Sequence, residues 1–199
     1  MLCALMLIAL LFALHLDHDR STVLPLPTGP FNVGRSSFTW FDDTRTDALA
    51  PPSLTRHAIV AWVWYPAVAR STSATEDYFP AAWRTAAEKY WRAINSGFIE
   101  RDLALVQTHG IRDAELSPKQ PRYPLVILRA GLAALTIEYT TLAEDLASHG
   151  YIVMGIDAPY RTQVVVLADG SVHHRAAEND PESFGEADGE HIANKLVAA

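Results

Sequence analysis

The chain has 199 residues, of which 49% are hydrophobic and 20% are charged, a composition typical of a globular domain with a sizeable core. Its formal net charge of −7, with no run of Lys or Arg, argues against a nucleic-acid partner, because binding phosphates requires a surplus of basic residues. The single cysteine, Cys3, excludes an internal disulfide and any cysteine-based zinc site.

An uninterrupted apolar run, MLCALMLIALLFAL, opens the chain. It is shorter than the roughly 20 apolar residues that span a bilayer, and no positive segment precedes it as in a secretory signal. Three interpretations stay open: a signal-like segment, the end of a membrane helix, or a buried helix of the fold. We expect residues 1–16 to be a hydrophobic segment of the signal-like or membrane-helix kind, in a membrane-associated or exported protein. A cytoplasmic protein is the alternative.

Extended chain and two strands are predicted next. Residues 21–36 contain three prolines and two glycines, which excludes a helix. Residues 37–41 are rich in aromatic and β-branched residues, and Asp42-Asp43 follows as a turn signal. Residues 57–65, HAIVAWVWY, are apolar on both faces, which is typical of a strand buried on both sides, and Pro66 is expected to end it.

Two helices and a loop are expected in the middle of the chain. Apolar residues at helical spacing predict a helix over 80–94, with Trp83, Tyr90 and Trp91 on its apolar stripe. We expect this stripe to pack in the core, and a lipid-facing patch at a substrate entrance is the alternative. A second helix is expected over about 98–107, followed by a loop over 110–122.

The clearest pattern is a β-α-β unit. Residues 124–128 form a short apolar run, Gly131 follows as a turn, and residues 136–149 have helical spacing with Thr136 as a candidate N-cap. Gly150 would cap that helix, and residues 151–156 form a second apolar run. This succession predicts a parallel pair of strands with a right-handed crossover, and therefore an α/β fold.

A hairpin and a final helix complete the predicted elements. The turn pair Asp169-Gly170 separates residues 163–167 from residues 171–174, which predicts a small hairpin. A helix is expected to begin near residue 186, and the chain ends inside it.

The turn after residues 124–128 is the first candidate site. Free backbone N–H groups at the start of a helix bind phosphate or stabilise an oxyanion. The sequence Arg129-Ala130-Gly131-Leu132 contains neither a P-loop nor a G-x-G-x-x-G motif, so it does not indicate a nucleotide. By itself this motif is typical of an ordinary turn between a strand and a helix.

Several segments resemble the motifs of one known family, in the same order along the chain. These segments are 27–34, 62–67, 123–132, 142–153 and 157–170. The family is that of the platelet-activating-factor acetylhydrolases, within the α/β-hydrolase superfamily.

The resemblance implies that residues 17–199 form an incomplete α/β-hydrolase domain, with a mostly parallel sheet and flanking helices. It implies a serine carboxylic-ester hydrolase that acts on short-acyl phospholipid or related esters with a Ser-His-Asp triad and without cofactor or metal. The backbone N–H of Leu132 would be one donor of the oxyanion hole. The family usually has His-Gly or Pro-Gly before this leucine, whereas this chain has Arg129-Ala130-Gly131, and the long Arg129 would alter the pocket.

No G-x-S-x-G motif, which exposes the nucleophile of this fold, occurs in the sequence. The nearest segment, PESFG around Ser183, has proline in place of the first glycine and follows no strand, so Ser183 is not expected to be the nucleophile. In this fold serine, acid and base follow a fifth strand in that order. All three would then lie beyond Ala199, and the chain alone would be inactive. The alternative is a degenerate, non-catalytic relative that serves as a binding or membrane-associated module.

The remaining candidate residues are interpreted as structural. His149, before Gly150, is expected to cap a helix, and Asp157 at a strand end is more typical of a turn or cap carboxylate than of a functional group. The pairs His173-His174 and His15/His18 lack further ligands at metal-binding spacing, so no metal site is expected.

Overall fold

The computed structural model describes residues 2–47, 49–50, 56–68, 74–91, 102–131 and 134–177. The strands of its main sheet are β1 (Thr22–Val23), β2 (Asn32–Thr46), β3 (Arg56–Ala67), β4 (Thr75–Asp77), β5 (Val106–Arg112), β6 (Leu125–Arg129) and β7 (Ile152–Asp157). Their order is β1-β5-β2-β3-β7-β6, and β4 pairs with β5 outside this path. The sheet is mixed: β6 and β7 are parallel, as are β5 and β2, whereas β3 is antiparallel to both of its neighbours.

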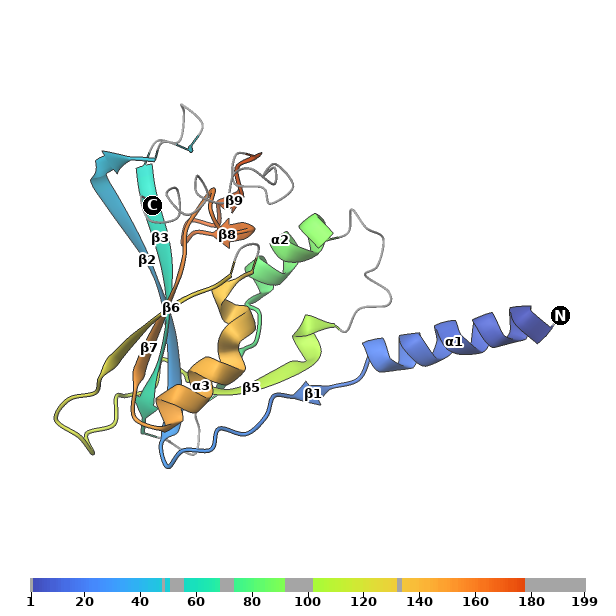
Figure 1. Cartoon of the computed structure of the whole chain (residues 1–199), viewed down its shortest axis with the longest axis horizontal. Helices are drawn as coiled ribbons and strands as arrows, with labels where there is room; N and C mark the ends of the chain where they lie inside the picture. Colours follow the sequence, from blue (N-terminus) through green and yellow to red (C-terminus); the bar gives the residue numbers. More distant parts are fainter. Residues whose placement is uncertain are drawn as a thin grey trace, which may run out of the picture.

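The apolar N-terminal run forms a helix, α1 (Leu2–His18), that extends away from the sheet (Figure 1). Its apolar side chains are exposed, with Met6 at 67% and Phe12 at 62%, so it is not a buried helix of the core. Among the described residues, no helix combines the length and the apolar character needed to cross a membrane.

The two strand predictions near residues 37–41 and 57–65 are confirmed as parts of longer strands that pair with each other. The predicted turn at Asp42-Asp43 is wrong, because β2 continues to Thr46. Asp42 instead accepts hydrogen bonds from the amide and hydroxyl of Thr44, at 2.9 and 2.6 Å, within an irregularity of the pairing. Pro66 pairs with Val33 inside the ladder, so β3 ends at Ala67, two residues beyond the predicted strand over 57–65.

The faces of β3 differ in burial. Trp62 and Trp64 are buried, but Ile59 and Val63 on the opposite face are only partly so. The expectation that β3 is covered on both sides is therefore correct for one face only.

The predicted helix over 80–94 is observed as α2 (Ala81–Trp91), and Trp83 on its stripe is buried against Trp62 with ring centroids 5.0 Å apart. Core packing is therefore the correct interpretation for Trp83, whereas the side chains of Tyr90 and Trp91 lie outside the described residues. The predicted helix over 98–107 is wrong for residues 102–107, the part that the structure describes. There a 3₁₀ turn, η2 (Leu103–Leu105), leads into β5. Alternating burial along β5 shows that pairing within the sheet overrides the local helical pattern.

The β-α-β prediction is confirmed. Strand β6 leads through a turn into the 3₁₀ helix η3 (Thr136–Tyr139) and α3 (Thr140–Ser148), and β7 returns parallel to β6. Gly150 has a φ of +94° after the helix, a conformation that favours glycine. Thr136 is not an N-cap, because Leu135 occupies that position and the Thr136 side chain bonds to β7.

Helices α2 and α3 lie on the same side of the sheet (Figure 1). The face beneath them, which we call the covered face, carries the main core, including Val60, Trp62, Trp64 and Val153. On the other face, which we call the open face, Leu125 and Ile127 of β6 are 56% and 54% exposed. The core of the described residues is therefore one-sided.

The predicted hairpin is also confirmed. It consists of β8 (Val164–Val166) and β9 (Val172–His174), which form a separate antiparallel pair. Gly170 adopts a φ of +82° in its turn. The expected helix near residue 186 lies outside the described residues.

Candidate active-site edge

The candidate site lies where β6 and β7 end. Because these strands are parallel, their carboxyl ends, Arg129 and Asp157, lie at the same edge of the sheet. Ligands of α/β proteins gather at this edge, in the loops that follow the strands. The turn from β6 to η3 and the turn from β7 to β8 both start here.

The turn after β6 is held by local hydrogen bonds. The amide of Gly131 donates to the Tyr139 hydroxyl at 3.3 Å, and the amide of Ala134 donates to the Gly131 carbonyl at 3.0 Å. Leu132 lies outside the described residues, so its role as an oxyanion donor stays a prediction. Arg129 shares the open face with Ile127, opposite the side on which α3 packs.

Asp157 is the most strongly buried acid at this edge, with 0% exposure. Its Oδ1 accepts hydrogen bonds from the Thr136 amide at 3.1 Å and the Thr136 hydroxyl at 3.0 Å, and its Oδ2 accepts one from Trp62 Nε1 at 2.8 Å. Burial raises the pKa of Asp157 to about 6, although the hydrogen bonds from Thr136 and Trp62 favour the charged form. The carboxylate thus links η3, β3 and β7.

Both ring nitrogens of His173 have hydrogen-bonding partners, which the sequence did not predict. Its Nδ1 lies 3.0 Å from the Tyr160 hydroxyl, and its Nε2 lies 3.0 Å from the Ser171 hydroxyl, which also donates to Asp169 at 2.6 Å. In a serine triad the carboxylate must bind the imidazole, so that the imidazole can take the serine proton. Here Asp169 binds the serine instead, and the group does not have the order of a catalytic triad. His174 next to it is exposed.

The other histidines have structural contacts. His149 occupies the C-cap of α3, as expected, and its Nε2 lies 2.9 Å from the Thr28 hydroxyl. His15 and His18 stack on each other on α1, with ring centroids 6.5 Å apart. Within the described part of the chain, no three potential metal ligands are grouped. Ser183 lies outside that part.

Sequence reasoning missed a buried charge beneath α3. Arg35 on β2 is 1% exposed, and its guanidinium lies over the rings of Trp62 and Trp64, at 4.9 and 5.4 Å. Burial lowers the pKa of Arg35 to about 10, and the nearby Glu76 and Glu144 oppose this. The sequence does carry a signal for this burial. Arg35 lies two residues from the apolar Val33 in a strand, so the alternation of side chains places both on the same, inward face.

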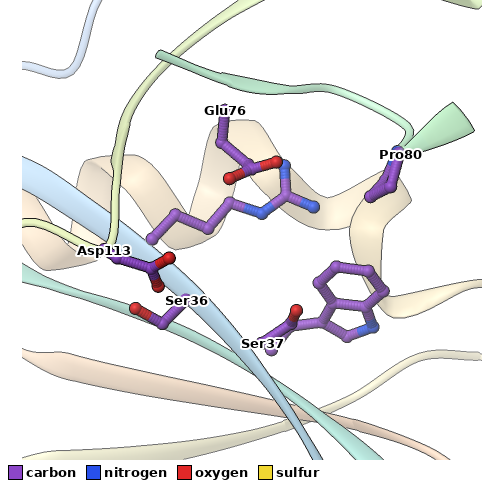
Figure 2. A pocket seen from close by; sticks show the side chains of 7 residues that line it. Ser36, Ser37, Glu76, Pro80 and Asp113 are labelled. Carbon is purple, nitrogen blue, oxygen red and sulfur yellow. The ribbon is translucent and has the colours of Figure 1, made fainter. Parts of the chain in front are cut away.

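A small cavity of about 80 Å³ adjoins this arginine. Figure 2 shows Ser36, Ser37, Glu76, Pro80 and Asp113 around it. Glu76 is bound to Arg112 at 2.7 Å, and the Ser36 hydroxyl lies 3.1 Å from the Tyr65 hydroxyl. Glu76 and Ser36 are thus engaged with other side chains, and the residues that line the cavity include no histidine that could act as a base, so the cavity does not have the features of a serine-hydrolase site.

Comparisons with known proteins agree with this architecture. The family model described as platelet-activating factor acetylhydrolase, isoform II, matches residues 18–179. No curated protein matches the chain. A solved ferulic acid esterase from Streptomyces cinnamoneus is similar, with a TM-score of 0.65 and 25% identity. The likeness covers 89% of this chain and 48% of the esterase, so the chain spans about half the length of that enzyme. The chain belongs to the family of platelet-activating factor acetylhydrolase, isoform II, and has the fold of the α/β-hydrolases.

Proposed function

We propose that this chain contributes the N-terminal part of a serine carboxylic-ester hydrolase that acts on short-acyl phospholipid or related esters. Membership of the family over residues 18–179 supports ester hydrolysis, as does the likeness to a protein described as a ferulic acid esterase. The observation that carries the proposal is the glycine-containing turn at the carboxyl end of β6, beside the buried Asp157.

The chemical role of that turn would be to stabilise negative charge. When a serine attacks an ester carbonyl, the carbonyl oxygen becomes an oxyanion, and backbone N–H groups held in a fixed position stabilise it. The amide of Gly131 already donates to Tyr139, so it is not the free donor. The next amide, that of Leu132, is the donor we propose.

The nucleophile, acid and base are proposed to lie outside these 199 residues, because the sequence has no G-x-S-x-G motif. We therefore expect the purified chain to release no p-nitrophenol from p-nitrophenyl acetate above the rate given by heat-denatured chain. A fluorophosphonate probe, which labels activated serines, should leave it unlabelled. Turnover that Ser183→Ala abolishes would overturn this assignment, and Ser171→Ala is the matched control.

The gene offers a second test. The DNA after codon 199 should encode a G-x-S-x-G motif within some tens of codons, in any frame. A protein expressed with that extension should hydrolyse the acetate ester and lose activity when the motif serine becomes alanine. Active extended protein without any such motif would contradict the proposed serine mechanism.

We also propose that α1 associates with lipid. It is apolar around its whole circumference and exposed, with Met6 at 67% and Ile8 at 62%. A helix of 17 residues is about 25 Å long. The full chain should float with phosphatidylcholine vesicles in a density gradient, and a chain without residues 1–16 should stay at the bottom. Equal flotation of both chains would contradict a lipid role for α1.

A further inference from the structure

The Asp157 carboxylate contacts the first residue of η3 through backbone and side chain together. The Thr136 amide and hydroxyl both donate to Oδ1, at 3.1 and 3.0 Å. The hydroxyl also lies 3.2 Å from the carbonyl oxygen of Ile156 on the same strand. Thr136 has no exposed surface, so water does not compete for these bonds. One acid of β7 thereby fixes where η3 begins.

The position of Thr136 against β7 is also set by shape. A Cβ at Gly155 would collide with the Thr136 side chain, so only glycine at this position lets η3 approach the strand this closely. The close packing against Gly155 and the hydrogen bonds to Asp157 both involve Thr136. The end of the turn that leads into η3 is therefore tied to the sheet in two ways.

The second carboxylate oxygen of Asp157, Oδ2, accepts a hydrogen bond from a side chain of the sheet. Trp62 on β3 donates its indole N–H to Oδ2 at 2.8 Å. The Trp62 ring is itself confined by the Trp83 ring, at 5.0 Å, and by the Arg35 guanidinium, at 4.9 Å. The confined Trp62 indole therefore fixes the orientation of the Asp157 carboxylate.

The turn between β6 and η3 is closed at its other end by Tyr139. That residue is the last of η3, and its hydroxyl accepts the Gly131 amide at 3.3 Å. The amide of Leu135, just before η3, donates to Glu138 Oε2 at 2.9 Å. Because residues of η3 accept the amides of both Gly131 and Leu135, displacing η3 would displace both of these residues.

We propose that Asp157 is a positioning residue, which holds η3 and through it Gly131 and Leu135, the described residues on either side of the proposed oxyanion donor. This inference rests on the function proposed above and names the residue that orients its oxyanion donor. Asp157 is fully buried, and its hydrogen bonds come from Thr136, Trp62 and Thr162. It therefore acts through these neighbours and does not touch substrate.

Several ionisable groups lie around Asp157. Arg35 of β2 lies behind the Trp62 ring, Glu138 belongs to η3, and Arg161 in the following turn is paired with Asp47 at 2.7 Å. Protonation of Asp157 would change the bonding directly, because its oxygens accept hydrogen bonds from Thr136 and Trp62, whereas a carboxylic acid has an O–H that must itself donate. The order of the turn should therefore depend on pH.

The test is amide hydrogen exchange of the full 199-residue chain, followed by mass spectrometry of a peptide covering residues 130–140. Asp157→Asn should raise exchange of this peptide roughly tenfold or more after correction for intrinsic rates, since bonds to a charged acceptor are lost. Asp47→Asn is the matched control, because Asp47 is also buried and its hydrogen bonds come from Arg161 and the Leu49 amide, which both lie outside residues 130–140. It should leave the peptide unchanged.

A second pair of variants keeps the proposal testable if Asp157→Asn does not fold. Thr136→Val removes the hydroxyl and should raise exchange of the same peptide, whereas Thr136→Ser keeps the hydroxyl and should not. In the wild-type chain the corrected exchange should also change across pH 5 to 7, and Asp157→Asn should abolish this change.

Two results would overturn the proposal. One is unchanged exchange of residues 130–140 in both Asp157→Asn and Thr136→Val. The other is an equal rise in peptides from β2 and β3, which would indicate global destabilisation only. Exchange reports on the turn whether or not any ester is hydrolysed. Failure of this inference is therefore distinguishable from failure of the proposed function.

Discussion

At the residue scale, Asp157 makes stability depend on pH. Burial raises its pKa to about 6, whereas the ordinary value for an aspartate is 3.8. Between these values the folded chain binds more protons at this site than the unfolded chain does. Its contribution to stability is therefore fully present below pH 4 and is lost as the pH rises through about 6.

We expect this loss to be about 3 kcal/mol in the free energy of unfolding between pH 4 and pH 7. Urea unfolding at several pH values should show that the difference between wild type and Asp157→Asn changes by this amount. Asp47 provides a control of opposite sign: burial raises its pKa, but hydrogen bonds from Arg161 and from the Leu49 amide lower it overall. A difference between wild type and Asp157→Asn that stays constant with pH would contradict the assignment.

Glu144 on α3 connects the helix to β5. It is 0% exposed, and its Oε1 accepts the amides of His109 and Gly110 at 2.9 and 2.7 Å. Burial raises the pKa of Glu144, while these amides and Arg35 oppose the rise. The acid thus serves as an acceptor for two strand amides rather than as a surface charge.

Glu144→Gln keeps this acceptor, and we expect it to change the free energy of unfolding by no more than about 1 kcal/mol. Glu144→Leu leaves both amides without an acceptor and should cost roughly 2–4 kcal/mol. Urea unfolding at pH 7 measures both variants. An equal loss of unfolding free energy in Glu144→Gln and Glu144→Leu would mean that the hydrogen bonds to the two amides do not account for the contribution of Glu144 to stability.

At the scale of elements, the two faces of the sheet differ in what covers them. Helix α3 packs Ala143 and Ala147 against the covered face, where both are 0% exposed. On the open face Phe38 and Trp40 stack with centroids 6.1 Å apart and remain 48% and 44% exposed. Strand β6 pairs with β7 and, among the described residues, stands at the edge of the sheet. Exposed edges and apolar faces of this kind promote association between chains.

We expect Ile127→Ser on the open face to lower self-association of the chain, measured by sedimentation velocity, and to change stability by no more than about 1 kcal/mol. Val153→Ser on the covered face is the matched control and should cost roughly 2–4 kcal/mol, because it buries an unpaired hydroxyl. A chain that is monomeric and unfolds cooperatively without the substitution would favour the alternative of a self-sufficient, non-catalytic relative.

At the scale of the whole molecule, the described residues form a one-sided α/β layer with one appended helix (Figure 1). The candidate turn and Asp157 lie at the carboxyl ends of β6 and β7. Helix α1 extends away from the sheet (Figure 1). The chain spans 48% of the similar esterase, and the family match covers residues 18–179, which excludes nearly all of α1. The proposed catalytic role and the proposed lipid contact therefore belong to separate parts of the chain.

The sequence by itself determined the local elements with strong patterns. Continuous apolar runs predicted β6 and β7, helical spacing predicted α2 and α3, and Gly150 marked a helix end, because each of these signals arises from neighbours along the chain. The family resemblance also came from sequence motifs, and the match over residues 18–179 confirmed it.

Only the tertiary structure decided the rest. Residues 106–107, expected at the end of a helix, and residues 110–112, expected in a loop, both belong to β5, because pairing with β1 and β2 outweighs local propensity. The roles of Arg35, Glu144 and Asp157 depend on partners between 21 and 109 residues away in sequence, counting Asp157 to Thr136 and Arg35 to Glu144. No local pattern encodes such contacts, since burial and hydrogen bonding across elements exist only once the sheet and its helices have come together.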